Sequence, residues 1–242
     1  MNWKGRGVRR AAFGAGCVIA GTVIGLTLPR SATPAAGQDL SPGTILISAD
    51  QRTLTASQGG SCANGTLDVQ ETPETVVVRV HTVPVAMIAP GSCALEIFSA
   101  TLSAPLGSRQ LVDGITGRRL PSFRGQGILR PSVLPAGFGH RYDAAFLGSD
   151  TIDGSSAGCT QVFTLGDSYD EAIWISQVAG GRWHTPDGVI ATAIMVRGQP
   201  GLAINGEIEW TEHGQLFTVQ SMTYAYATLG TRDLIAIANS LR

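Results

Sequence analysis

Lysine is nearly absent from this 242-residue chain, which contains one lysine and sixteen arginines. Charged residues of both signs make up only 14% of the sequence. No basic excess occurs outside the first 30 residues, which argues against a nucleic acid partner. Hydrophobic residues make up 43% of the sequence. A chain with this much apolar content can build a folded core, so its low charge does not indicate disorder.

Recognisable catalytic and metal-binding patterns are also missing. The chain has no Cys-x-x-Cys pair, and none of its four histidines stands at a ligand spacing from another. The letters G-x-S-x-G occur at residues 154–158, but a polar loop precedes them and a strand candidate follows. A nucleophile elbow needs a strand before the serine and a helix after it. We therefore expect no catalytic residue, no metal and no cofactor.

One long apolar run is present, at residues 11–28, and it contains no charged residue. As a helix it would extend about 27 Å, enough for a thin hydrocarbon core. Only Arg30 follows it closely, whereas four basic residues precede it: Lys4, Arg6, Arg9 and Arg10. This bias predicts a single-pass protein of the cell membrane, with residues 1–30 as a cytoplasmic stub and transmembrane anchor and the bulk outside. The alternative is a signal cleaved after Thr33 and Ala35, which would release a secreted protein.

The part beyond residue 30 has twelve basic and eighteen acidic residues, a net charge of −6. It also holds three cysteines. Outside the cytoplasm the environment is oxidising, so these cysteines could form disulfides. We expect a Cys62–Cys93 bridge, because both fall in one β-rich unit, and closure of that loop would contribute about 3–4 kcal/mol. Cys159 would then remain a thiol; the alternative is that all three are reduced.

Strand-like patterns dominate the first half of the exported part. Residues 31–43 form a linker rich in small residues and proline. Residues 44–125 contain short strand candidates about ten residues apart, which is typical of a small β-sandwich. Val76, Val78 and Val80 alternate with other residues, so we expect them to share the buried face of one strand.

The second half combines a sheet with one helix. Residues 126–158 are rich in proline and glycine and are expected to form a connector. Residues 159–242 begin with five strand candidates and end in a helical pattern with Thr231 as its expected N-cap. Its apolar face would comprise Leu234, Ile237, Ala238 and Leu241. The predicted fold class is mainly β (α+β): a transmembrane helix, a β-sandwich-like unit, and an antiparallel sheet capped by a C-terminal α-helix.

The order of short motifs over about residues 170–242 supports a resemblance. An ISQ strand is followed by a VRG turn, by the tryptophan hairpin IEWTEHGQLFTVQS and by the closing LIAIANSL helix. This arrangement resembles a bacterial extracytoplasmic domain of unknown function that is found behind single membrane helices, as in actinobacterial envelope proteins. The resemblance covers under a third of the chain. It implies a buried tryptophan, a tight turn and a capping helix, and it implies no catalytic residue.

Two groups of residues are candidates for binding. The first could line an aromatic ligand groove or simply fill the core: Trp174, Trp210, Tyr224 and Tyr226. The second could bind anionic headgroups or an acidic partner, or form a solvated edge that resists strand pairing: Arg118, Arg119, Arg124 and Arg130.

Together these patterns favour a membrane-anchored extracytoplasmic protein that acts as a non-catalytic binding or interaction module of the cell envelope. Its expected partners are the membrane, through residues 11–28, and an envelope protein or lipid. One alternative is a carrier-like domain for a lipid or other apolar ligand, which would need an apolar pocket between the last sheet and the helix. The other is a hydrolase of unrecognised type.

Overall fold

The computed structural model describes residues 37–58, 63–84, 96–147, 156–166, 171–181, 190–223 and 229–242. Among these residues no helix has both the length and the apolar character to cross a membrane. The apolar run at 11–28 lies outside the described residues, as do Cys62 and Cys93 with the bridge expected between them. Tyr224 and Tyr226 also lie outside them.

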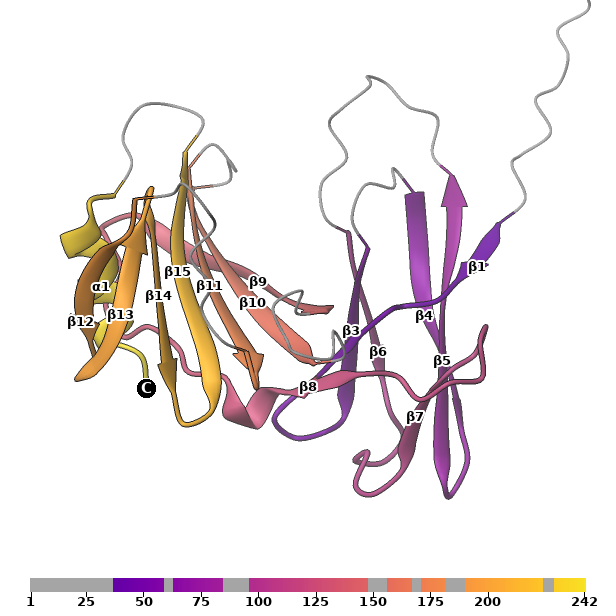
Figure 1. The fold of residues 1–242 in the computed structure, drawn as a ribbon. Coiled ribbons are helices and arrows are strands. Elements are labelled where there is room, and N and C mark those ends of the chain that lie inside the picture. Colours follow the sequence, from indigo (N-terminus) through magenta and orange to yellow (C-terminus); the bar gives the residue numbers. More distant parts are fainter. Residues whose placement is uncertain are drawn as a thin grey trace, which may run out of the picture. The chain divides into compact units, whose positions relative to one another are not determined.

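Strands dominate the described part of the chain, which confirms the mainly β fold class. Two four-stranded sheets form its first part (Figure 1). The first sheet contains β1 (Gln38–Leu40), β5 (Thr75–Pro84), β4 (Ala63–Glu71) and β7 (Gln110–Asp113). The second contains β6 (Glu96–Thr101), β3 (Thr53–Gln58), β2 (Ile45–Ile47) and β8 (Ser122–Arg124), and a short 3-10 helix, η1 (Gly125–Gly127), follows it. The β2–β8 and β5–β7 pairs are parallel.

A shared apolar core joins these two sheets. Val76, Val78 and Val80 are fully buried on one face of β5, as their alternation predicts. They belong to one cluster with Ile47 and Leu54 of the second sheet. The two sheets therefore pack face to face as a sandwich.

The second part is a seven-stranded antiparallel sheet in the order β12-β13-β14-β15-β11-β10-β9. Its strands are β9 (Phe138–Leu147), β10 (Ala157–Leu165), β11 (Glu171–Ala179), β12 (Thr192–Val196), β13 (Gln199–Ile204), β14 (Glu207–Glu212) and β15 (Gln215–Thr223). Three two-residue turns connect β12 to β15, and positive φ angles occur at Arg197, Asn205 and His213 and at the glycine after each. Such turns suit the twist of antiparallel hairpins and fix their register.

Helix α1 (Thr231–Asn239) covers one face of this sheet (Figure 1). Its predicted apolar positions Leu234, Ile237 and Ala238 are buried and pack in one cluster with Trp210 and Phe217. The expected face of the helix is thus confirmed, and side chains fill the contact between helix and sheet.

The ends of α1 differ from the sequence prediction. The N-cap is Gly230, whose N–H donates to Oδ2 of Asp233 at 3.1 Å, and Thr231 is the first helical residue. In a capping box the side chain of the third helical residue accepts from the N–H of the N-cap residue, and Asp233 fills that role here. The helix ends at Asn239, and Leu241 makes an isolated β-bridge with Pro131.

Part of the expected connector is a strand. Residues 138–147, inside the proline- and glycine-rich segment, form β9 at the edge of the seven-stranded sheet. Its register against β10 shifts between Val162 and Phe163, which marks a bulge. An edge strand needs only one partner and tolerates polar residues and bulges, so its sequence pattern is weak.

A third cluster lies where β9 and β10 approach the second sheet of the sandwich. Leu46 and Phe123 pack there with Ala145 and Cys159. Ser57 Oγ donates to the carbonyl oxygen of Ala145 at 2.6 Å. The described residues from Gly37 to the C-terminus belong to one compact unit, and this contact lies within it.

Candidate functional site

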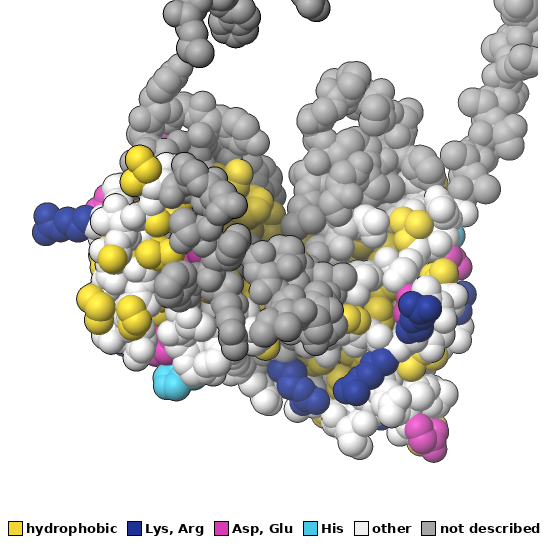
Figure 2. Space-filling model, viewed as in Figure 1, with side chains coloured by type: hydrophobic (Ala, Val, Ile, Leu, Met, Phe, Trp, Pro, Cys, Tyr) yellow, Lys and Arg dark blue, Asp and Glu magenta, His cyan; other side chains and the backbone are white. Residues whose placement is uncertain are grey.

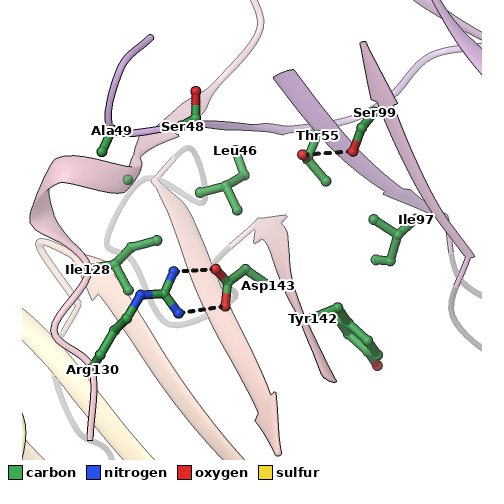
Figure 3. Close-up of a pocket in the computed structure, with 11 residues that line it drawn as sticks. Leu46, Ser48, Ala49, Thr55, Ile97, Ser99, Ile128, Arg130, Tyr142 and Asp143 are labelled. Atoms are coloured by element: carbon green, nitrogen blue, oxygen red, sulfur yellow. Dashed lines mark hydrogen bonds and ion pairs between the residues drawn. The ribbon is translucent and has the colours of Figure 1, made fainter. Parts of the chain in front are cut away.

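A cavity of about 400 Å³ lies beside this third cluster (Figure 3). Three parts of the chain line it: the second sheet of the sandwich, the segment after β8, and strand β9. The lining residues are Leu46, Ser48, Ala49, Thr55, Ile97, Ser99, Gly125, Ile128, Arg130, Tyr142 and Asp143.

An ion pair forms one wall of the cavity. Arg130 donates from Nη2 to Oδ2 of Asp143 at 2.6 Å, and from Nη1 to Oδ1 at 3.4 Å. His140 Nε2 lies 2.8 Å from the same Oδ1. The Asp143 side chain is only 15% exposed, whereas that of Arg130 is 52% exposed. The guanidinium therefore stands at the solvent side of the pair while the carboxylate is held inside.

Two buried glutamines fix the segment that presents Arg130. Gln161 and Gln177 lie on β10 and β11, and each donates from Nε2 to the carbonyl oxygen of Leu129, at 2.8 and 3.0 Å. Arg130 Nη1 also lies 3.4 Å from Oε1 of Gln161. Because these amides are fully buried, they hold the backbone of residue 129 and so direct the next side chain towards Asp143.

Hydroxyl groups and aliphatic side chains form the other walls. Thr55 Oγ1 and Ser99 Oγ lie 3.0 Å apart on neighbouring strands, and Figure 3 shows them on a different wall from the ion pair. Leu46, Ile97 and Ile128 add apolar surface. The cavity thus combines hydrogen-bonding groups with an apolar lining, as small-molecule sites do.

Cys159 is buried in the third cluster, which adjoins the cavity through Leu46. Burial raises the pKa of its thiol to about 12; the negative charge of Asp143 acts in the same direction, and Arg130 opposes it. A thiol that stays protonated at physiological pH is a poor nucleophile. Among the described residues, no three or more His, Cys, Asp or Glu side chains are grouped so as to hold a metal ion.

The sheet does not bring the two predicted tryptophans together. Trp210 pairs with Phe217, which pairs with Gln177, so these three residues share one face. Trp174 is three residues before Gln177 on β11 and therefore lies on the opposite face. Trp210 donates from Nε1 to Oε2 of Glu212 at 3.3 Å, whereas Trp174 Nε1 is buried with no hydrogen-bond partner.

The four predicted arginines fall into two places. Arg119 and Arg124 line a hollow of about 110 Å³ together with Arg109. Arg118 is exposed on the turn just before Arg119. Arg130 instead lines the cavity of about 400 Å³. The structure therefore brings Arg119 and Arg124 together and separates Arg130 from them.

Strand β12 is the other unusual feature. Residues 190–196 contain no charged residue, glycine or proline, although β12 is an edge strand. Met195 is 61% exposed and Ile190, just before the strand, is 89% exposed. Apolar side chains are visible in Figure 2 on the side of the molecule that holds β12 and β13 in Figure 1.

Sequence reasoning missed Asp143, His140 and the Thr55–Ser99 pair. A signal was available in Gln161 and Gln177, which are polar residues at buried positions of otherwise apolar strands. No protein-family model matches the sequence, and no curated protein is found to match it. The candidate sites therefore rest on geometry and chemistry alone.

Proposed function

We propose that this protein is a membrane-anchored, non-catalytic interaction module of the cell envelope, and that it binds an extended segment of another envelope protein along β12. The supporting observation is the composition of that edge. Edge strands normally carry charges, proline or bulges that prevent pairing with other chains. Residues 190–196 have no charge and no proline, and Met195 is largely exposed.

The opposite edge of the same sheet provides an internal comparison. Strand β9 carries His140, Arg141 and Asp143 and contains a bulge. These features are the usual protection against edge-to-edge pairing. The β9 edge of the sheet therefore carries features that prevent pairing with another chain, whereas β12 carries no charge and no proline. The unprotected composition is a property of β12 and not of both edges of this sheet.

Hydrogen-bonding geometry supports strand addition at β12. A two-residue turn at Arg197 joins β12 to β13, so Val196 and Gln199 form a hydrogen-bonded pair. By alternation, the amides of Ala193 and Met195 point away from β13. An added strand would bond to these amides and place side chains against Met195.

The carrier alternative gains no support from the packing of α1. A carrier would need room between the sheet and the helix. Leu234 and Ile237 of α1 are buried there against Trp210, so side chains occupy that space.

The proposal is tested in native membranes with the full-length protein. A photo-crosslinking amino acid at Met195 should capture one specific protein, and Ala193→Pro should abolish the product. Proline removes the outward amide of residue 193 without removing a bond to β13. Ala193→Lys should also abolish it, whereas Ala236→Lys, which adds the same charge on the exposed side of α1, should not. A product that persists in both residue-193 variants, or capture of lipid only, would refute strand addition.

A further inference from the structure

We infer that the cavity lined by Arg130 and Asp143 binds a neutral, polyhydroxylated ligand, namely a sugar ring. The site lies at the β9 side of the sheet, and the inference does not depend on partner binding at β12. Its volume, about 400 Å³, falls within the range of about 300–1,000 Å³ that is typical of small-molecule pockets.

The charges that line the cavity cancel. Among the described residues that line it, Arg130 and Asp143 are the only Arg, Lys, Asp or Glu, and they already pair with each other at 2.6 Å. An anionic ligand that approached the guanidinium would meet the carboxylate, and a cation would meet the guanidinium. Displacement of either partner would leave a charge uncompensated, and for Asp143 that charge is largely buried. The lining therefore selects against a formal charge.

The polar atoms match adjacent hydroxyl groups. A carboxylate accepts hydrogen bonds and a guanidinium donates them, and here the two groups stand side by side. A hydroxyl both donates and accepts, so two neighbouring hydroxyls of one ring can bond to Asp143 and Arg130 together. Thr55 and Ser99 provide further donors and acceptors on another wall (Figure 3).

The rest of the lining suits the apolar face of a sugar. Ile97 and Ile128 present aliphatic surface, and Tyr142 presents an aromatic ring. A pyranose ring carries C–H groups on its faces and hydroxyls around its rim. Contact of those C–H groups with this surface removes apolar area from water, while the rim bonds to the polar walls.

The test uses three probes that share one ring. The full-length protein, in a zwitterionic detergent without a sugar headgroup, is titrated with the methyl glycosides of glucose, glucuronic acid and glucosamine, followed by calorimetry and saturation-transfer NMR. Methyl galactoside, mannoside and arabinoside extend the neutral set. We expect a neutral glycoside to bind and its charged counterparts to bind more weakly. Tighter binding of the acid or the amine would overturn the inference, as would no binding of any neutral probe at about 10 mM, a concentration that detects millimolar affinity.

Matched variants locate the site. Asp143→Asn and Thr55→Val should each weaken binding about tenfold, the loss expected for one hydrogen bond. Thr53→Val makes the same change two residues earlier on β3, outside the cavity lining, and should leave affinity unchanged. Equal weakening by Thr53→Val and Thr55→Val would show that binding lies elsewhere and would overturn the assignment. The β12 variants should bind the glycoside normally, so failure of one proposal is distinguishable from failure of the other.

Discussion

Arg197 donates from Nε to Oε2 of Glu212 at 2.7 Å, which links the turn after β12 to the end of β14. The same side chain donates from Nη1 to the carbonyl oxygen of Leu241 at 2.5 Å. The Arg197 backbone N–H donates to Oδ1 of Asn239 at 2.7 Å. One turn residue therefore ties the C-terminal segment to the sheet that it covers.

Removal of this link should loosen the C-terminal segment. Burial opposes ionisation of Glu212, but hydrogen bonds from Arg197 and Trp210 outweigh it, so the pKa of this carboxyl is lowered. Arg197→Met should lower the free energy of unfolding by about 2 kcal/mol, the scale of hydrogen bonds to charged groups. Urea denaturation measures the change. As a control, Arg232→Met on the exposed side of α1 should change the free energy of unfolding by less than about 0.5 kcal/mol. An equal loss in both variants would refute the stabilising role of Arg197.

The two tryptophans on opposite faces should respond differently to the same substitution. Trp210→Phe removes buried volume and the bond to Glu212, so it should cost about 3 kcal/mol. Trp174→Phe removes a buried N–H that has no partner, and relief of that penalty should offset most of the lost contact. Unfolding free energies from urea denaturation compare the two variants. A larger loss for Trp174→Phe would mean that its N–H is satisfied in solution.

Local periodicity was sufficient to predict several elements. The alternation of Val76, Val78 and Val80 depends only on the pleat of one strand, and the face of α1 formed by Leu234 and Ile237 depends only on the helical period. Each pattern is complete within ten residues. For that reason the mainly β class and the C-terminal helix could be predicted from the sequence.

The candidate sites depend on pairing between distant segments. Thr55 meets Ser99 only through the β3–β6 register, and Gln177 reaches Leu129 across 48 positions of the chain. The opposite orientation of Trp174 and Trp210 likewise follows from the order and register of three strands. Periodicity within one strand does not determine register against another, so residues that meet across strands could not be assigned from the sequence.

Acid should destabilise the sandwich through Asp113. Burial opposes its ionisation, but hydrogen bonds from Thr116, from the Ile115 N–H and from Ser41 outweigh it, so its pKa is below the ordinary value. A carboxyl with a lowered native pKa adds stability above its unfolded pKa, about 4, and loses it as the pH falls through the native pKa. Unfolding free energy measured at a series of pH values should therefore fall below about pH 4. Asp113→Asn should lower stability at neutral pH and flatten that profile; an unchanged profile would exclude Asp113 as the cause.

The thiol of Cys159 should resist modification in the folded protein. Burial raises its pKa to about 12, so both access and thiolate formation are suppressed. Iodoacetamide at mildly alkaline pH should label Cys159 in urea but not in the native state, as mass spectrometry would detect. Non-reducing peptide mapping should give a peptide that joins Cys62 to Cys93. Any peptide that joins Cys159 to either of them would contradict both expectations.

Gly201 should tolerate no side chain, because β13 and β14 approach closely there. A Cβ at this position would lie 2.5 Å from the carbonyl oxygen of Glu209 and 3.1 Å from Cβ of Trp210. The ladder that pairs Gly201 with Trp210 prevents the strands from separating locally. Gly201→Ala should therefore lower the free energy of unfolding by about 2 kcal/mol or more. Gly139→Ala on the edge strand β9 adds the same methyl where no atom lies within 4 Å, and thermal denaturation should show a clearly higher melting temperature for this variant than for Gly201→Ala.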